Sequence, residues 1–255
     1  MNRYKLFNNV LGWLIGIAAC AVYIMTAEAT ASWWDCGEYI ATSYNLEVGH
    51  PPGAPTFQLF GRLFSMFASP ETAAFAVNCM SAVVSGLGIM FLFWTITLLG
   101  KLIIRNPKPE LKDPRTWAIF AAGVVGAMCY CFSDTYWFSA VEGEVYATSS
   151  FFTAVVFWAI LKWEEQSDDP HSLRWLILVC FLVGLAIGVH LLNLLTIPAI
   201  VYVVYFKKWP KTTTKGFIIS GLISVVILAL VLWGVIPWVV NHSYAFDVFY
   251  VNKLP

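Results

Sequence analysis

Long apolar runs alternate with short polar segments along this chain of 255 residues. Most of the runs are close to the roughly 20 residues that a helix needs to cross a bilayer. Backbone groups inside lipid must be hydrogen bonded within their own segment, and a helix achieves this. The pattern therefore predicts an all-α fold, a polytopic membrane helix bundle of about seven transmembrane helices. The predicted spans are residues 10–26, 73–100, 117–136, 146–163, 175–190, 191–206 and 216–240.

The fifth and sixth spans come from one apolar run, residues 175–206, which is too long for a single crossing. Polar residues and a proline lie near its middle, so we interpret the run as two short helices that meet near the outer surface. The composition agrees with a membrane protein, because 59% of the residues are hydrophobic and 12% are charged. An ordinary soluble domain has about 25% charged residues.

The positive charges indicate the topology. Thirteen of the fifteen lysines and arginines fall in four short clusters, at residues 3–5, 101–115, 162–174 and 207–215. All four clusters lie on the same side of the predicted membrane, and the positive-inside rule makes that side cytoplasmic. The N-terminus is then cytoplasmic, and the outer loops are residues 28–70 and 137–145.

The first span also has features of a cleaved signal peptide, because a basic start and an apolar run precede Ala27-Glu28-Ala29. Its apolar run exceeds the roughly 7–15 residues of a signal-peptide core, so we predict a retained helix and keep cleavage as the alternative. The sequence contains no Walker loop, dinucleotide-binding fingerprint or HExxH motif. No metal site is predicted from the sequence, although a divalent metal would be compatible with it.

Two carboxylates stand out at the start of the first outer loop. Ser32 and Asp35 have the spacing of a helix capping box. Asp35 and Glu38 are three residues apart, so on a helix they share a face. One carboxylate of such a pair can act as a general base while the other raises its pKa or orients a ligand. The alternative is that Asp35 merely favours the helix N-terminus and Glu38 is solvated.

Two further candidates follow in the same loop. His50 lies in a rigid turn of three prolines and two glycines, which suits a proton carrier or a phosphate ligand, or else a surface histidine. Apolar residues at helical spacing between positions 57 and 67 predict a short interfacial helix that carries Arg62. Arg62 is a candidate for binding an anionic lipid headgroup, and its alternative is snorkelling to ordinary phospholipid.

Residues 133–146, which contain the second outer loop, combine three acids, Asp134, Glu142 and Glu144, with four aromatic residues. Such a mixture is typical of sugar-binding surfaces, although it also fits an aromatic belt with exposed acids. Glu142 and Glu144 are two residues apart and would not share a face of one regular helix, so at least one should point into a cavity. His190 is a polar residue near membrane depth, where it is either functional or a packing residue.

Four segments of the chain resemble one family of membrane proteins. The segments are WDCGEY at 34–39, GHPPG at 49–53, FSD at 132–134 and EGEVY at 142–146. They resemble, in the same order, glycosyltransferase family 117, whose members are common in Bacteroidetes. A vertebrate transmembrane protein O-mannosyltransferase is similar to this family. The resemblance runs from about residue 8 to the end of the chain.

The resemblance implies a GT-C-like fold in which residues 1–255 form one transmembrane domain, the N-terminal part of a larger GT-C module. It implies transfer of a sugar, a hexose such as mannose, from a polyprenyl-phosphate donor to an acceptor protein or glycan, for instance to a protein serine or threonine. The reaction would take place on the outer face of a bacterial inner membrane. Beyond this lipid-linked donor it implies no certain cofactor, and no nucleic acid is expected as a partner.

In such enzymes an acid early in the first outer loop is catalytic, and Asp35 lies at that place, accompanied by Glu38. The other predicted site residues bind substrate, and they are His50, Arg62, Asp134, Glu142, Glu144 and His190. The competing interpretation is a non-catalytic membrane subunit or a lipid-binding scaffold of a larger assembly. A transporter is less favoured, because the charged residues lie at the outer mouth rather than in mid-membrane.

Overall fold

The computed structural model describes residues 3–106 and 108–253, so residues 1, 2, 107, 254 and 255 of the predicted domain 1–255 lie outside it. Every regular element in the described part is a helix, which confirms the predicted all-α bundle. The chain forms two compact units, residues 1–193 and residues 194–255.

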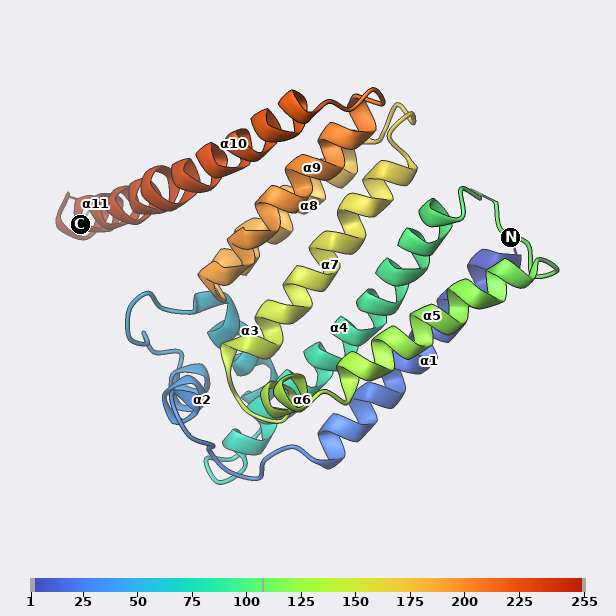
Figure 1. Cartoon of the computed structure of the whole chain (residues 1–255). Helices are drawn as coiled ribbons and strands as arrows, with labels where there is room; N and C mark the ends of the chain where they lie inside the picture. Colours follow the sequence, from blue (N-terminus) through green and yellow to red (C-terminus); the bar gives the residue numbers. More distant parts are fainter. Residues whose placement is uncertain (1–2, 107, 254–255) are drawn as a thin grey trace. The chain divides into compact units, whose positions relative to one another are not determined.

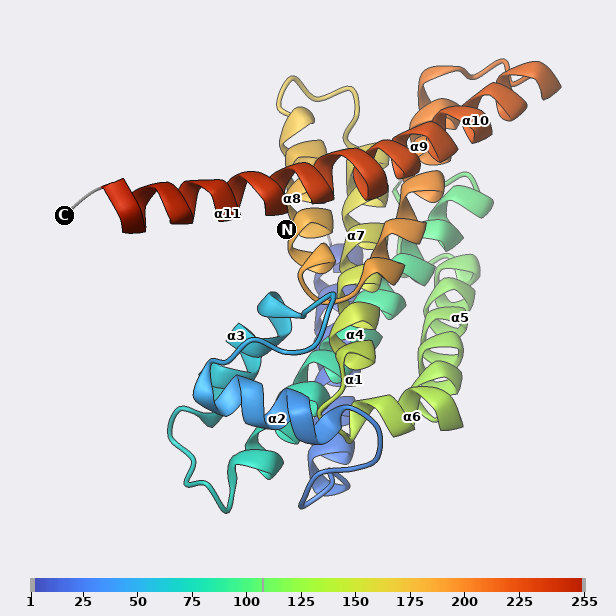
Figure 2. The same cartoon turned by 90° about the vertical axis from the view of Figure 1, so that its left-hand side faces the viewer.

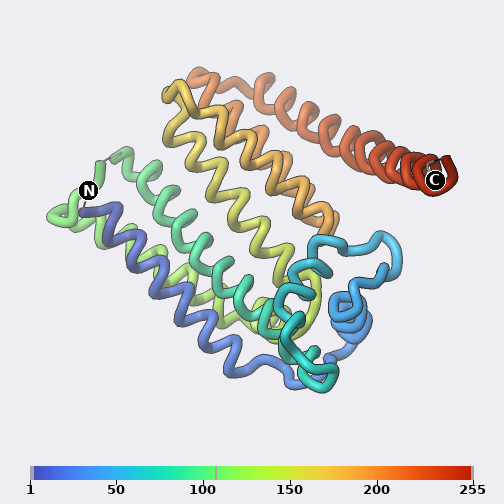
Figure 3. Tube along the Cα trace, turned by 180° about the vertical axis from the view of Figure 1, so that it is seen from behind, coloured from blue at the N-terminus to red at the C-terminus, as the bar shows by residue number. Residues whose placement is uncertain are grey.

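The first unit is an up-and-down arrangement of apolar helices (Figures 1 and 3). Its long helices are α1 (Arg3–Met25), α4 (Ala73–Ile103), α5 (Pro114–Cys131), α7 (Val145–Glu165) and α8 (Leu173–Ile187). The central helix α4 packs against α1, α5 and α7. Small residues allow this close approach. A Cβ on Gly86 of α4 would lie 2.6 Å from the backbone nitrogen of Cys20 on α1.

Three short helices lie together at one end of this unit (Figure 2). They are α2 (Cys36–Asn45), α3 (Pro55–Ser65) and α6 (Asp134–Ala140). The first two belong to the first outer loop, so the predicted helical content of that loop is confirmed. A Cβ on Gly61 of α3 would lie 2.5 Å from the Ser43 hydroxyl of α2, which shows how closely the two helices pack.

The third predicted span is not one straight helix. The chain bends by 68° between α5 and α6. The bend lies at Phe132 and Ser133, where Ser133 has extended backbone angles (φ −72°, ψ 139°) as the N-cap of α6. Helix α6 therefore leads the chain toward α2 and α3 instead of continuing the span to residue 136.

Fewer helices than the predicted seven have the length and composition of a span in the described residues. Five qualify, or six if the bent pair α5 and α6 is counted as one span. Helix α8 is apolar but has 15 residues. The apolar run 175–206 is interrupted after Ile187, and a short 3-10 helix, Leu191–Leu195, follows the interruption.

The second unit consists of α9 (Thr196–Lys208), α10 (Thr214–Leu230) and α11 (Ile236–Lys253). Helices α9 and α10 pack against each other, and the backbone N–H of Thr213 donates to the Tyr205 hydroxyl at 3.2 Å. A π-helical turn, Val231–Val235, joins α10 to α11. The resulting helix runs for 40 residues and does not end at residue 240, where the predicted span ends.

Candidate functional site

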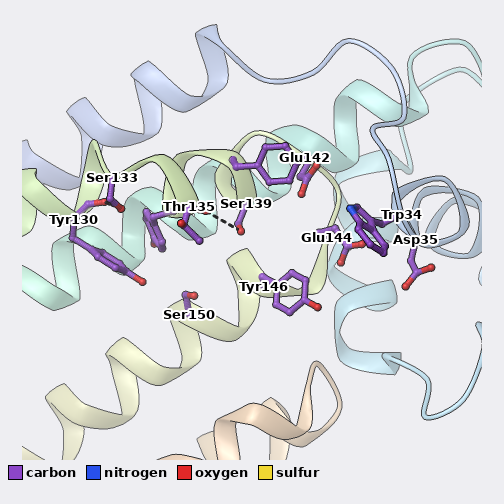
Figure 4. Close-up of a pocket in the computed structure, with 12 residues that line it drawn as sticks. Trp34, Asp35, Tyr130, Ser133, Thr135, Ser139, Glu142, Glu144, Tyr146 and Ser150 are labelled. Atoms are coloured by element: carbon purple, nitrogen blue, oxygen red, sulfur yellow. Dashed lines mark hydrogen bonds between the residues drawn. The ribbon is translucent and has the colours of Figure 1, made fainter.

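A cavity of about 560 Å³ opens in the first unit beside the short helix α6 (Figure 4). We call it the outer groove. Helices α5, α6 and α7 form its walls, and the segment before α2 closes one end. Its lining residues are Trp34, Asp35, Tyr130, Ser133, Thr135, Tyr136, Phe138, Ser139, Glu142, Glu144, Tyr146 and Ser150.

Three carboxyl groups lie at the same end of the outer groove: Asp35, Glu142 and Glu144 (Figure 4). No described residue that lines the groove is basic. The remaining lining side chains are hydroxyls and aromatic rings. A groove of this composition offers hydrogen bonds to a polyhydroxylated ligand and flat apolar faces for its ring, so it suits a carbohydrate.

The two glutamates are positioned by the turn between α6 and α7. Glu144 is the N-cap of α7, and its carboxylate accepts a hydrogen bond from the backbone N–H of Val145 at 3.1 Å. This end of a helix favours a negative charge. The backbone N–H of Glu144 also donates to the Glu142 carbonyl at 2.9 Å. Both glutamates are buried, with 3% of Glu142 and 5% of Glu144 exposed.

Burial changes the proton affinity of both glutamates. It raises the pKa of Glu142, and hydrogen bonds from the Ser32 and Cys36 side chains oppose the increase. It raises the pKa of Glu144 to about 7, and the negative charges of Asp35 and Glu142 add to the effect of burial. A carboxyl group that titrates near neutral pH in a groove is a candidate for acid–base chemistry.

Gly143 and Asn78 hold together the turn that carries Glu144 and the backbone that leads to Asp35. The sequence-based prediction missed both residues. A Cβ on Gly143 would lie 3.0 Å from the Asn78 side-chain oxygen and 3.2 Å from Val77. The buried Asn78 amide donates to the carbonyls of Glu28 (2.7 Å) and Thr30 (3.0 Å). Helix α4 thus fixes both the turn that carries Glu144 and the backbone that leads to Asp35.

Substitution of Gly143 by alanine should therefore lower the stability of the protein. The added methyl group requires Asn78, Ile40 and Val77 to move by a few tenths of an ångström, and overpacking in a closely packed site costs about 1–3 kcal/mol. Thermal unfolding in detergent measures the effect. Gly184 on α8 is the matched control, because a Cβ there meets nothing within 4 Å. Equal melting temperatures for Gly143→Ala and Gly184→Ala would contradict the packing argument.

Asp35 directly precedes α2 and is its N-cap, without a side-chain capping bond. The helix begins at Cys36, so the predicted capping box that starts at Ser32 is wrong. Trp34 has a positive φ of 62°, which is uncommon for a residue with a side chain. This left-handed residue turns the chain into α2, and Trp34 and Asp35 both lie at the groove (Figure 4).

His50 joins the two carboxylates of the first outer loop. Its ring Nδ1 lies 2.9 Å from Glu38 Oε2, and its backbone N–H donates to Glu38 Oε1 at 2.5 Å. Its Nε2 lies 3.9 Å from Asp35 Oδ2. The hydrogen bond with Glu38 and the charge of Glu38 raise the pKa of His50, and the bonds from His50 lower the pKa of Glu38. We call Asp35, Glu38 and His50 the outer triad.

Three other predicted site residues do not line the outer groove. The Arg62 guanidinium donates to the Tyr44 carbonyl and lies over the Tyr44 ring, 5.5 Å from its centre. Asp134 is exposed in the first turn of α6. The His190 ring lies 5.6 Å from the ring of Tyr146, which does line the groove. Their roles in substrate binding stay predictions.

Residues 35–213 match a protein family described as the protein O-mannosyl-transferase TMEM260 N-terminal domain. The chain is 27% identical over 145 residues to a Dictyostelium discoideum protein named protein O-mannosyl-transferase tmem260, which covers 56% of this chain and 16% of that protein. It is 23% identical over 170 residues to the Mus musculus protein O-mannosyl-transferase TMEM260. This match covers 67% of this chain and 22% of the mouse protein. The chain thus spans less than a quarter of the length of either relative. No solved structure matches the chain.

Proposed function

Because the chain belongs to the family of the protein O-mannosyl-transferase TMEM260 N-terminal domain, we propose that it carries the catalytic groove of a membrane glycosyltransferase. The donor is a polyprenyl-phosphate-linked hexose such as mannose, and the acceptor is a protein serine or threonine hydroxyl. The family match begins at Asp35 and includes every groove-lining residue except Trp34. The part of the chain that resembles mannosyltransferases is therefore the part that builds the outer groove.

One observation carries the proposal: the exposed carboxylate of Asp35 lies in the same groove as the two buried carboxyl groups of Glu142 and Glu144. Glycosyl transfer to a hydroxyl requires a group that accepts the hydroxyl proton. It also requires a ligand site for sugar hydroxyls, which the groove's serines, threonine and glutamates provide. The rings of Trp34 and Tyr146 supply flat surfaces for the sugar.

The proposed reaction is a single displacement. The acceptor oxygen attacks the anomeric carbon of the donor sugar and forms the new glycosidic bond. The bond between that carbon and the phosphate oxygen breaks, and its electron pair leaves with the polyprenyl phosphate. Asp35 accepts the proton of the hydroxyl, because it lies at the mouth of the groove where an acceptor enters. Glu142 and Glu144 hold the sugar hydroxyls.

We place the groove on the outer, periplasmic face of a bacterial inner membrane. The last turns of α4 and α7 carry Lys101 and Lys162. These turns lie at the end of the first unit opposite α2, α3 and α6 (Figure 1). By the positive-inside rule the lysine end is cytoplasmic, and the groove end then faces outward.

Cysteine labelling tests this topology. A cysteine at Asn45, in the last turn of α2, should react with a membrane-impermeant maleimide in intact cells. A cysteine at Glu110, between α4 and α5, should react only after permeabilisation. The unsubstituted protein measures the background labelling of the native thiols. Labelling of both introduced cysteines from the same side would end this topology.

The activity itself is tested by transfer of a radiolabelled hexose from polyprenyl phosphate to serine- and threonine-containing peptides. The full chain is used in nanodiscs, and donor binding is measured separately by equilibrium dialysis. Transfer, or saturable binding that requires both the sugar and the phosphate, supports the proposal. Absence of both would refute it. Binding that Asp35→Asn leaves intact, without any transfer by the wild type, would favour the lipid-binding scaffold instead.

A further inference from the structure

We propose that the outer triad of Asp35, Glu38 and His50 binds a divalent transition-metal cation, Mn²⁺ or Zn²⁺, at the mouth of the outer groove. The binding of the ion does not depend on the proposed function. Its role, which is to receive the donor phosphate, rests on the proposed function. The experiment below therefore measures binding without sugar transfer.

The distances between the ligand atoms fit a shared ion. One ligand atom from each residue of the triad lies within 4.8 Å of the other two. Two atoms bound to the same ion at about 2.1 Å lie at most about 4.2 Å apart. His50 Nε2 and Asp35 Oδ2, at 3.9 Å, are already within this limit. The Asp35 and His50 side chains are about half exposed, so small rotations can adjust both ligand atoms to the ion while Glu38 stays bonded to Nδ1 of His50.

Glu38 orients the imidazole for this task. It accepts hydrogen bonds from the backbone N–H of His50 and from Nδ1 of the same residue. A proton on Nδ1 leaves the lone pair of Nε2 free on the side that faces Asp35. Metal-binding histidines are typically held in this way, with a carboxylate on the nitrogen that does not bind the metal.

A buried side chain beside the triad gives independent support. Gln58 is 8% exposed, and its Nε2 has no hydrogen-bond partner in the described part of the chain. Gln58 Nε2 and Glu38 Oε1 both lie 3.1 Å from the point where a Cβ on Gly49 would sit. A half-turn of the amide exchanges its nitrogen for its oxygen. Gln58 can thus present a carbonyl oxygen beside Glu38, to the ion or to water bound to the ion.

The charge of the groove explains why an ion is needed there. A phosphate-linked donor is an anion, and the groove is lined by three carboxyl groups and by no described basic residue. Arg62 points its guanidinium at the Tyr44 carbonyl instead. A divalent ion would be the largest local charge and would reverse the sign of the potential at the groove mouth. Bound through Asp35 Oδ2, it leaves Oδ1 available to the acceptor hydroxyl.

The ligand set indicates the class of metal. One imidazole nitrogen with two or three oxygens suits Mn²⁺ or Zn²⁺ better than Ca²⁺, which takes six to eight oxygen ligands. The competing arrangement is a protonated His50 that bridges the two carboxylates without any metal. The two arrangements make different demands on residue 50. In the metal site a carboxylate at this position can replace the imidazole as a ligand. In the metal-free bridge a carboxylate cannot replace the positive charge of a protonated His50.

The test uses the full chain in nanodiscs after removal of metals with a chelator. Mn²⁺ binding is followed by the loss of the free-ion electron paramagnetic resonance signal, and bound Zn²⁺ is counted by mass spectrometry. The wild type should bind one ion per chain. His50→Gln and Asp35→Asn should weaken binding at least tenfold, and Glu38→Gln by about 10–100-fold. His50→Asp should recover part of the affinity that His50→Gln loses.

His171→Gln is the matched control. His171 lies 3.4 Å from Asp169 in an exposed pair that has no third ligand among the described residues, so the control should bind metal like the wild type. No saturable binding up to millimolar Mn²⁺ and Zn²⁺, or equal binding by wild type and His50→Gln, would overturn the site. Specific binding without any sugar transfer would support the site and count against the proposed function alone. Sugar transfer by a protein that binds no ion would support the proposed function and count against the metal site.

Discussion

Asp35→Asn is expected to lower sugar transfer by at least about two orders of magnitude without unfolding the protein. A serine or threonine hydroxyl is a weak nucleophile at neutral pH, and a positioned general base contributes about 10²–10⁴-fold to its reaction. Asparagine keeps the size and planar shape of the side chain but cannot accept the proton. Asp35 makes no side-chain capping bond to α2, so its replacement should cost little stability. Turnover with saturating donor measures the effect.

Asp168→Asn makes the same chemical change in the exposed segment between α7 and α8 and should leave transfer unchanged. Donor affinity and melting temperature are measured for both variants. A folded Asp35→Asn variant that binds donor and transfers sugar at the wild-type rate would show that Asp35 is not the general base. A slower rate at saturating donor and saturating divalent ion is the expected result, because a general base acts in the transition state rather than in the bound ground state.

The helix bundle was predictable because few backbone conformations satisfy all their hydrogen bonds within lipid. An apolar run of about 20 residues has to be a helix, so α1, α4 and α7 could be located from composition alone. The bend between α5 and α6 could not, because apolar and aromatic residues continue through it. Ser133 and Asp134 are the local signal that could have revealed it, since a serine N-cap followed by an acid in the first turn is typical of a new helix.

The residues of the outer groove were easier to predict than their arrangement. The sequence pattern indicated Glu142 and Glu144 as site residues, but the directions of their side chains were predicted as if both lay on one regular helix. Instead, they lie on a tight turn in which Gly143 packs against α4, and both side chains line the groove. The role of Asn78 was not predictable, because a lone asparagine in an apolar run gives no indication of the carbonyl groups that it contacts.

Arg62 illustrates a limit of the same kind. Its place on an interfacial helix made it a candidate for binding an anionic lipid headgroup, but gave no indication of its contacts within the protein. In the structure this guanidinium donates to the carbonyl of Tyr44, in the last turn of α2, where helix carbonyls lack partners within the helix. That contact depends on how α2 packs against α3, which the pattern of either helix alone does not determine.

Glu144→Gln should remove most of the pH dependence of donor binding near neutral pH. The pKa of Glu144 is raised from its ordinary 4.5 to about 7, so the side chain is neutral below that pH and negatively charged above it. The donor is an anion and should bind better when Glu144 is neutral. If only the neutral form binds, wild-type affinity falls about tenfold between pH 6 and pH 8. Glutamine imitates the neutral form at every pH.

The same titration has a consequence for stability, with a definite sign. Between pH 4.5 and about 7 the folded protein retains a proton on Glu144 that the unfolded chain has already released. The free energy of unfolding therefore falls as pH rises through this window, and it levels off above it. Glutamine does not titrate. Glu144→Gln should thus melt at a higher temperature than the wild type at pH 8, and the difference should disappear toward pH 4.5.

Donor affinity measured from pH 5.5 to 8.5 in nanodiscs decides the role of Glu144, with the exposed Glu47→Gln as the matched control. The charge of Asp35 contributes to the raised pKa of Glu144. Asp35→Asn should therefore move the midpoint of the pH dependence to lower pH while keeping its amplitude. A pH profile that Glu144→Gln leaves unchanged would assign the titration to another group, and an unmoved midpoint in Asp35→Asn would show that the two carboxyl groups do not interact.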